Sequence, residues 1–122
     1  MMVGQKKYQE VFNIVDALGV GNWTQLVFFA HYDEGSFVMK LYAKSKTGKY
    51  VDLYATEQLR EKITDAYIKI DKVLCQSQKE EGWKTITLIF EPTGKFNADY
   101  DYREIEGRFT DYLRSWKGKY LA

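Results

Sequence analysis

The chain has one histidine, His31, and one cysteine, Cys75, so it carries few groups that could do nucleophilic or metal chemistry. A metal site needs several converging ligands, and a nucleophilic triad needs a nucleophile, a base and a group that orients the base. His31 lies between aromatic neighbours with no obvious nucleophile nearby, and Cys75 follows a helical pattern whose lysines are typical of a helix surface. We therefore predict no metal site and no catalytic residue among these side chains.

A pair of carboxylates is the other candidate for chemistry. Asp99 and Asp101 are two residues apart in a strand-like run, which places both on one face of a strand. Such pairs can divide the roles of general acid and general base. Asp101 can instead cap a following helix, and Asp99 can lie on a solvated face or contact a partner. We favour these roles over catalysis and expect that the chain is not an enzyme.

Charge is concentrated near the end of the chain rather than in its total. The whole chain has a formal charge of +1, which argues against the basic surface that binds nucleic acid. Residues 91–111 contain six acids and three bases, a net charge of −3. Such a surface attracts basic partners, nuclease domains among them, although an ordinary solvated face also explains it. The predicted partner-binding residues are Asp99, Glu104 and Glu106, together with Asp33 and Glu34 of an earlier turn.

The length and composition predict one folded domain over residues 1–122. With 45% hydrophobic and 29% charged residues, the chain lacks the signature of disorder, and 122 residues leave no room for a second core. The first residues do not resemble a signal peptide, and no apolar run is long enough to span a bilayer. We therefore expect a cytoplasmic protein that does not bind a membrane.

The first half of the chain predicts a helix followed by a three-stranded meander. Apolar residues before residue 20 recur at spacings of three and four, as on one face of a helix. Runs rich in β-branched and aromatic residues, at 23–32, 37–43 and 50–55, predict strands separated by polar turns. In the second of these strands, Phe37, Met39, Leu41 and Ala43 share one face.

The second half predicts a long helix, a hairpin and a last helix. The long helix begins after Thr56 and ends at Gly82. A half-buried strand over 84–91 turns through Pro92 to Gly94 into a return strand. Asp101 is expected to cap the last helix, with Glu104 at its third position and an end near Gly118.

These elements give an α+β fold. Their order is α-β-β-β-α-β-β-α, with three helices and an antiparallel sheet of about five strands. We expect the helices on one face of the sheet or at its ends.

The last third of the chain resembles the YezG-like immunity proteins of bacterial polymorphic toxin and contact-dependent inhibition systems. The resemblance is carried by GWKT at 82–85, a threonine-rich strand ending at Phe90-Glu91, and GKFNADYDY at 94–102. It implies a cytoplasmic antitoxin without a cofactor, encoded beside a secreted toxin whose C-terminal domain, commonly a nuclease, it binds and neutralises. The complex is expected to be tight and one-to-one. The alternative is a small adaptor that accepts peptides at an exposed sheet edge.

Overall fold

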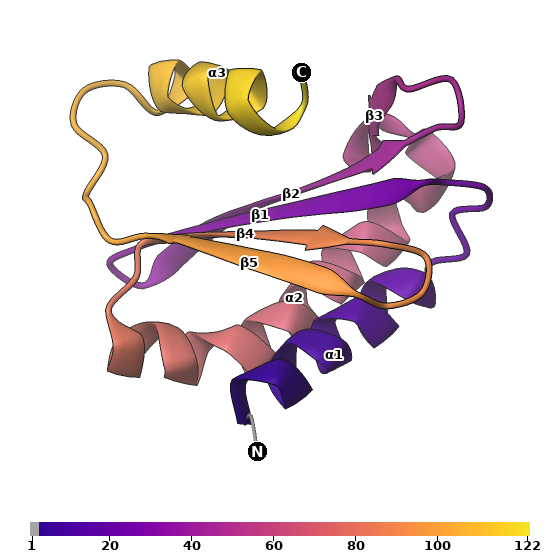
Figure 1. Cartoon of the computed structure of the whole chain (residues 1–122). Coiled ribbons are helices and arrows are strands. Elements are labelled where there is room, and N and C mark those ends of the chain that lie inside the picture. Colours follow the sequence, from indigo (N-terminus) through magenta and orange to yellow (C-terminus); the bar gives the residue numbers. More distant parts are fainter. Residues whose placement is uncertain (1–2) are drawn as a thin grey trace.

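The computed structural model describes residues 3–122, which form three α-helices, one 3-10 helix and five strands (Figure 1). Their order confirms the predicted α-β-β-β-α-β-β-α arrangement and the α+β class. The elements are α1 (Val3–Asp16), β1 (Gln25–Asp33), β2 (Ser36–Lys44), β3 (Tyr50–Asp52), η1 (Leu53–Ala55), α2 (Glu57–Glu81), β4 (Thr85–Phe90), β5 (Phe96–Asp101) and α3 (Phe109–Tyr120).

The strands form one antiparallel sheet in the order β3-β2-β1-β4-β5. β1 is central and pairs with β2 on one side and β4 on the other. The predicted hairpin from β4 to β5 is present, with Phe90 opposite Phe96. Gly94 has φ 92°, and its N–H donates to the Glu91 carbonyl at 2.9 Å. A glycine takes this left-handed conformation without steric cost, so Gly94 fits the tight turn.

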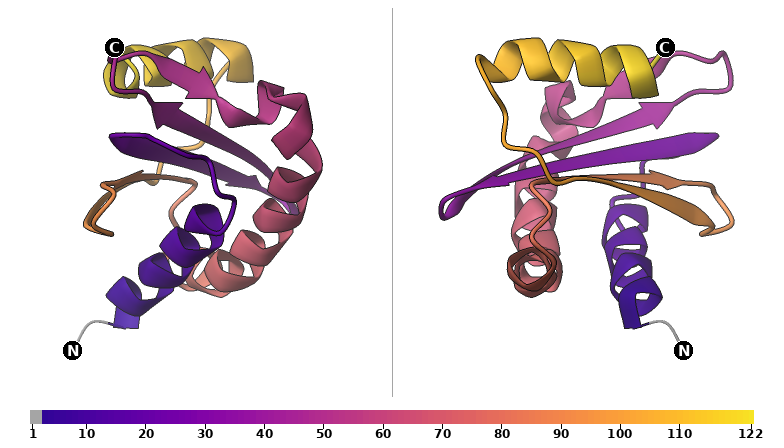
Figure 2. Two further views of the ribbon diagram at one scale, coloured as in Figure 1. Left: turned by 90° about the vertical axis from the view of Figure 1, so that its right-hand side faces the viewer. Right: turned by 60° about the vertical axis from the view of Figure 1, so that its left-hand side comes forward.

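The main core lies between the sheet and the two helices α1 and α2, which cover the same face (Figure 2). The apolar stripe predicted before residue 20 is buried there, as are the apolar residues of α2. The most completely buried side chains on this side of the sheet include Phe28, Leu41, Ile63, Ile70, Leu74, Trp83, Ile86, Leu88 and Phe90.

A second, smaller core lies on the other face of the sheet, beneath α3 (Figure 1). It consists of Val27, Phe29, Tyr42 and Trp116, with partly buried residues of α3 around them. The expectation that helices cover one face or the ends is therefore wrong, as is the half-buried strand over 84–91. Thr85 and Thr87 are 2% and 3% exposed because α3 covers their face of the sheet.

Two predicted elements have different boundaries. The strand over 50–55 stops at Asp52, whose carboxylate accepts a hydrogen bond from the Tyr54 N–H at 3.0 Å and begins a 3-10 turn. The last helix begins at Phe109 rather than after Asp101, and it continues past Gly118 to Tyr120. Gly107 has φ 80°, which no residue of a right-handed helix adopts.

Asp101 and Glu104 therefore do not form the predicted helix cap. The Asp101 carboxylate instead accepts from the N–H of Arg103, two residues later, at 3.0 Å. This local turn competes with helix formation, which is a common property of aspartate. Residues 102–108 connect β5 to α3 without forming a helix or a strand.

Candidate functional site

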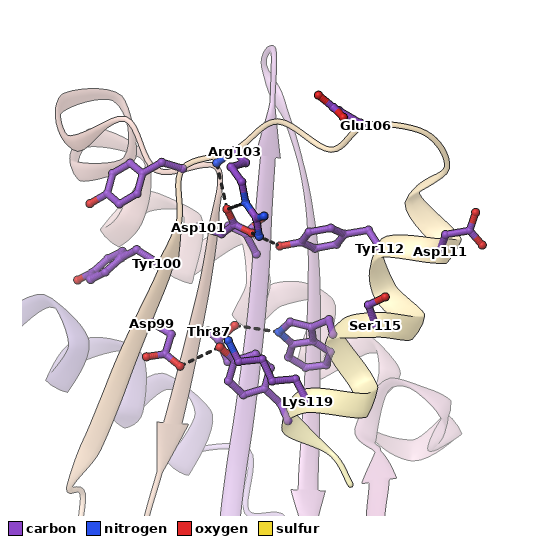
Figure 3. A pocket seen from close by; sticks show the side chains of 14 residues that line it. Thr87, Asp99, Tyr100, Asp101, Arg103, Glu106, Asp111, Tyr112, Ser115 and Lys119 are labelled. Carbon is purple, nitrogen blue, oxygen red and sulfur yellow. Dashed lines mark hydrogen bonds and ion pairs between the residues drawn. The ribbon is translucent and has the colours of Figure 1, made fainter.

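A groove of about 870 Å³ separates the edge of the sheet at β4 and β5 from α3. Figure 3 shows its walls: Asp99 and Asp101 point from β5 toward α3, while Tyr112 points back from α3. The connecting segment 102–108 closes one end. We call this space the groove; its principal lining residues are Thr85, Thr87, Asp99, Asp101, Glu106, Tyr112, Trp116 and Tyr120.

Three hydrogen bonds join α3 to the sheet across the groove (Figure 3). The indole Nε1 of Trp116 donates to the Thr87 hydroxyl at 2.9 Å, and both groups are buried. The Tyr112 hydroxyl donates to Asp101 at 3.1 Å, and the Tyr120 hydroxyl donates to Asp99 at 2.8 Å. These bonds set the distance between the helix and the last two strands.

Asp101 has a structural part in this arrangement. Its two oxygens accept from the Arg103 guanidinium at 3.1 and 3.2 Å as well as from Tyr112. The hydrogen bond from the Arg103 side chain is the main reason that the pKa of Asp101 lies below its usual range. Asp101 thus stays ionised and holds the start of the connecting segment against α3.

Asp99 is placed to contact a partner. It is exposed, and the hydrogen bond from Tyr120 uses its Oδ2 atom. Burial, with a contribution from this hydrogen bond, raises the pKa of Tyr120 to about 12, so the hydroxyl remains a donor at neutral pH. A carboxylate offers about four lone-pair positions, so Asp99 keeps capacity to accept from a Lys or Arg of another molecule.

The other predicted partner-binding residues lie on two exposed segments. Glu106 lines the groove with Asp99. Glu104 lies on the same segment outside the groove, with its side chain 83% exposed and 3.9 Å from the Lys84 ammonium. Asp33 and Glu34 lie at the exposed turn between β1 and β2 and do not line the groove. Figure 1 shows this turn at the same end of the sheet as residues 102–108.

The groove includes residues that the sequence interpretation did not assign to a site. Thr87 was expected on a solvated face, and Tyr112 and Trp116 were expected in an ordinary helix stripe. A signal was present in the middle strand, where Val27 and Phe29 alternate with the apolar residues of the opposite face. Strands that are apolar on both faces are typical of a sheet covered on both sides.

His31 lies beneath α3 beside the groove. It is 8% exposed, and its Nδ1 is 2.9 Å from the Thr85 hydroxyl. Its ring lies 6.0 Å from the ring of Phe109 and 6.3 Å from that of Tyr112, measured between centroids. This packing against α3 supports the expected structural role.

The burial of His31 predicts a pH-dependent stability. Burial lowers the pKa of His31, the charge of Lys84 lowers it further, and Asp33 and Asp101 oppose these effects. In the unfolded chain a histidine titrates near pH 6.5, so below about that pH the unfolded state binds more protons than the folded state. We expect the free energy of unfolding to fall as the pH decreases from about 6.5.

This expectation can be checked by thermal unfolding at several pH values, with His31→Gln as the control. The lowered pKa of Asp101 also contributes stability, but that part is lost only as the pH falls below about 3.9, the value of an unperturbed aspartate. The wild-type melting temperature should therefore drop between about pH 6.5 and pH 4.5, and the variant should show a flatter curve. Parallel curves would show that His31 does not cause the dependence.

The structure and known sequences add three further findings. No helix within residues 3–122 is both long and apolar enough to cross a membrane. Over these same residues, no group of three or more His, Cys, Asp or Glu side chains is placed to hold a metal ion. A family model described as "Immunity protein YezG-like" matches residues 5–122, whereas no curated protein sequence matches the chain.

Proposed function

The chain belongs to the YezG-like family of immunity proteins, and from this membership we propose that it binds a cognate toxin domain and neutralises it. The observation that carries the proposal is that the family match covers residues 5–122, nearly the whole chain. We propose further that the toxin domain is a nuclease, and that the two proteins form a tight one-to-one complex in the cytoplasm of the producing cell. In this proposal the protein acts by binding rather than by catalysis.

We propose that the interface includes the acidic residues at the end of the chain. Asp99, Glu104 and Glu106 are all exposed, and two of them line the groove. A nuclease has a basic surface because its substrate is a polyanion, and opposite charges speed encounter and select the partner. Asp33 and Glu34 lie at the same end of the sheet and extend this acidic surface (Figure 1).

Exposed aromatic side chains beside these acids supply the apolar contacts that the proposal needs. Tyr100 is 38% exposed and Tyr102 is 57% exposed, and their rings lie 6.3 Å apart between centroids. Tyrosines are frequent among the few residues that provide most of the affinity of an interface. In the proposed complex, the acids mainly set the association rate and these tyrosines slow dissociation.

The open edge of β5 supports a second candidate function, an adaptor that binds peptides. The two functions differ in stoichiometry and affinity. An immunity protein forms one tight complex with the toxin domain encoded beside it, whereas an adaptor binds several short peptides with micromolar dissociation constants.

The test uses the domain encoded by the reading frame next to that of this chain. Wild-type protein should bind this domain tightly and protect cells that express it. Reversing Asp99, Glu104 and Glu106 together to Lys should weaken binding by at least about tenfold, or about 1.4 kcal/mol. The circular dichroism spectrum and the melting temperature should remain near those of the wild type, because all three side chains are exposed.

The matched control reverses three exposed acids on the helices of the opposite face, Glu10, Glu61 and Asp65. It changes the net charge equally, so it should retain wild-type affinity if the location of the acids matters. Equal weakening in both triple variants would mean that total charge, not the proposed surface, governs binding. Failure of the wild-type protein to bind or protect would overturn the proposed function itself.

A further inference from the structure

β5 provides an open edge that a strand of another molecule can join. Among residues 3–122, no strand pairs with its outer edge, which Figure 2 shows free at the side of the sheet. β5 has six residues in extended conformation. The opposite edge is formed by β3, which has three residues and runs directly into the 3-10 turn. β5 is therefore the longer of the two edges.

The backbone hydrogen bonds identify which groups this edge offers. The carbonyls of Lys95 and Asp101 both accept from the neighbouring chain, from the N–H of Glu91 and of Lys84, each at 2.8 Å. In an antiparallel ladder, residues alternate between pointing toward the paired strand and pointing away. Lys95 and Asp101 are an even number of residues apart, so the residues that point outward are Phe96, Ala98 and Tyr100.

A strand added to this edge would lie between two different surfaces. On one side is the groove, which is lined by four acids and two bases: Asp99, Asp101, Glu106, Asp111, Arg103 and Lys119. On the other side are the exposed rings of Tyr100 and Tyr102. Because side chains alternate along a strand, one face of the incoming segment meets net negative charge and the other meets aromatic rings.

The charge of the groove also decides between possible occupants of the edge. If β5 paired with β5 of a second copy, Asp99 and Asp101 of both copies would lie on neighbouring strands. Like charges in such cross-strand positions are destabilising. A basic segment meets the opposite situation, since Asp99 can accept hydrogen bonds from its side chains.

We propose that an extended segment of the toxin domain, with Lys or Arg at alternate positions, adds to β5 as a further strand. Its basic side chains enter the groove beneath α3, and the residues between them pack against Tyr100 and Tyr102. Backbone hydrogen bonds to Phe96, Ala98 and Tyr100 supply affinity, and the charges fix the register. The identity of the partner rests on the proposed function, whereas the mode of binding rests on the geometry of β5.

One experiment blocks the edge without removing a charge. Ala98→Pro deletes an outward-facing N–H, and proline is tolerated at edge positions whose N–H does not take part in the ladder. Ala98→Val enlarges the same side chain and keeps the N–H, so it is the matched control. With the neighbour-encoded toxin domain, Ala98→Pro should bind at least about tenfold more weakly than Ala98→Val. Equal affinities in folded variants would overturn strand addition while leaving the proposed function intact.

A second measurement uses the wild-type protein, so it does not depend on the folding of the proline variant. The probe is a short peptide of alternating lysine and threonine, and the control peptide has glutamate in place of lysine. Amide NMR signals of Phe96, Ala98 and Tyr100 should shift with the lysine peptide, which should bind at least about tenfold more tightly than the glutamate peptide. Shifts confined to other elements, no shifts at all, or equal binding of both peptides would contradict the proposal.

Discussion

Replacing Trp116 by alanine is expected to lower the free energy of unfolding by about 3–5 kcal/mol, the range measured for large aromatic truncations in cores. The indole is 5% exposed and meets Phe29 edge-on at 4.9 Å between centroids. It also lies 5.7 Å from the ring of Tyr42. Truncation would leave a cavity in the small core beneath α3 and would remove the hydrogen bond to the buried Thr87 hydroxyl.

Equilibrium unfolding in urea measures this loss, and Trp116→Phe separates its two causes. Phenylalanine keeps most of the ring but has no N–H for Thr87, and leaving a buried polar group unpaired costs about 1–3 kcal/mol. Because α3 forms one wall of the groove, Trp116→Ala should also weaken binding of the toxin domain. A loss of less than about 1 kcal/mol for Trp116→Ala would show that α3 contributes little to the stability of the fold.

The second large effect is expected at Trp83. This residue is 0% exposed, with Tyr32 5.6 Å and Tyr100 6.2 Å from it between ring centroids. Trp83→Ala should cost about 3–5 kcal/mol, because the main core cannot close over the volume lost. Since Trp83 also contacts the base of β5, this variant should loosen the edge strand.

The indole N–H of Trp83 gives this prediction a sharp control. Within residues 3–122 its Nε1 is buried and has no hydrogen-bond partner. Trp83→Phe removes an unpaired polar atom from the core, which offsets part of the cost of the smaller ring. Urea unfolding should therefore show a smaller loss for Trp83→Phe than for Trp116→Phe. The reverse order would mean that hydrogen bonding does not distinguish the two tryptophans.

Most of the fold could be predicted because the periodicity of apolar residues is local. The stripe of α2 and the alternation of β4 each specify an element without reference to the rest of the chain. The start of α3 could not be predicted in this way, because Asp101 followed by Glu104 matches a helix cap. The competing turn at Arg103 and the positive φ of Gly107 decided that boundary, and neither is apparent from residue spacing.

The candidate site was predictable in part for the same reason. Asp99 and Glu106 belong to a charge cluster that is visible in the sequence, and both line the groove. Tyr112, Tyr120 and Thr87 line it because α3 crosses back over the sheet, which is a tertiary arrangement. Periodicity predicts which residues of a helix share a face, but it does not say which surface that face will cover.

The attachment of α3 gives the molecule two levels of local stability. This helix is tied to the rest by a segment without regular structure and by a small core of its own, whereas α1 and α2 share the larger core. Units with fewer buried contacts open at a lower free energy than the whole molecule unfolds. A ligand that fills the groove only while α3 is docked shifts this local equilibrium by mass action. Occupancy of the groove would then slow the opening of α3 more than that of the sheet, so binding would be recorded in the local stability of the last helix.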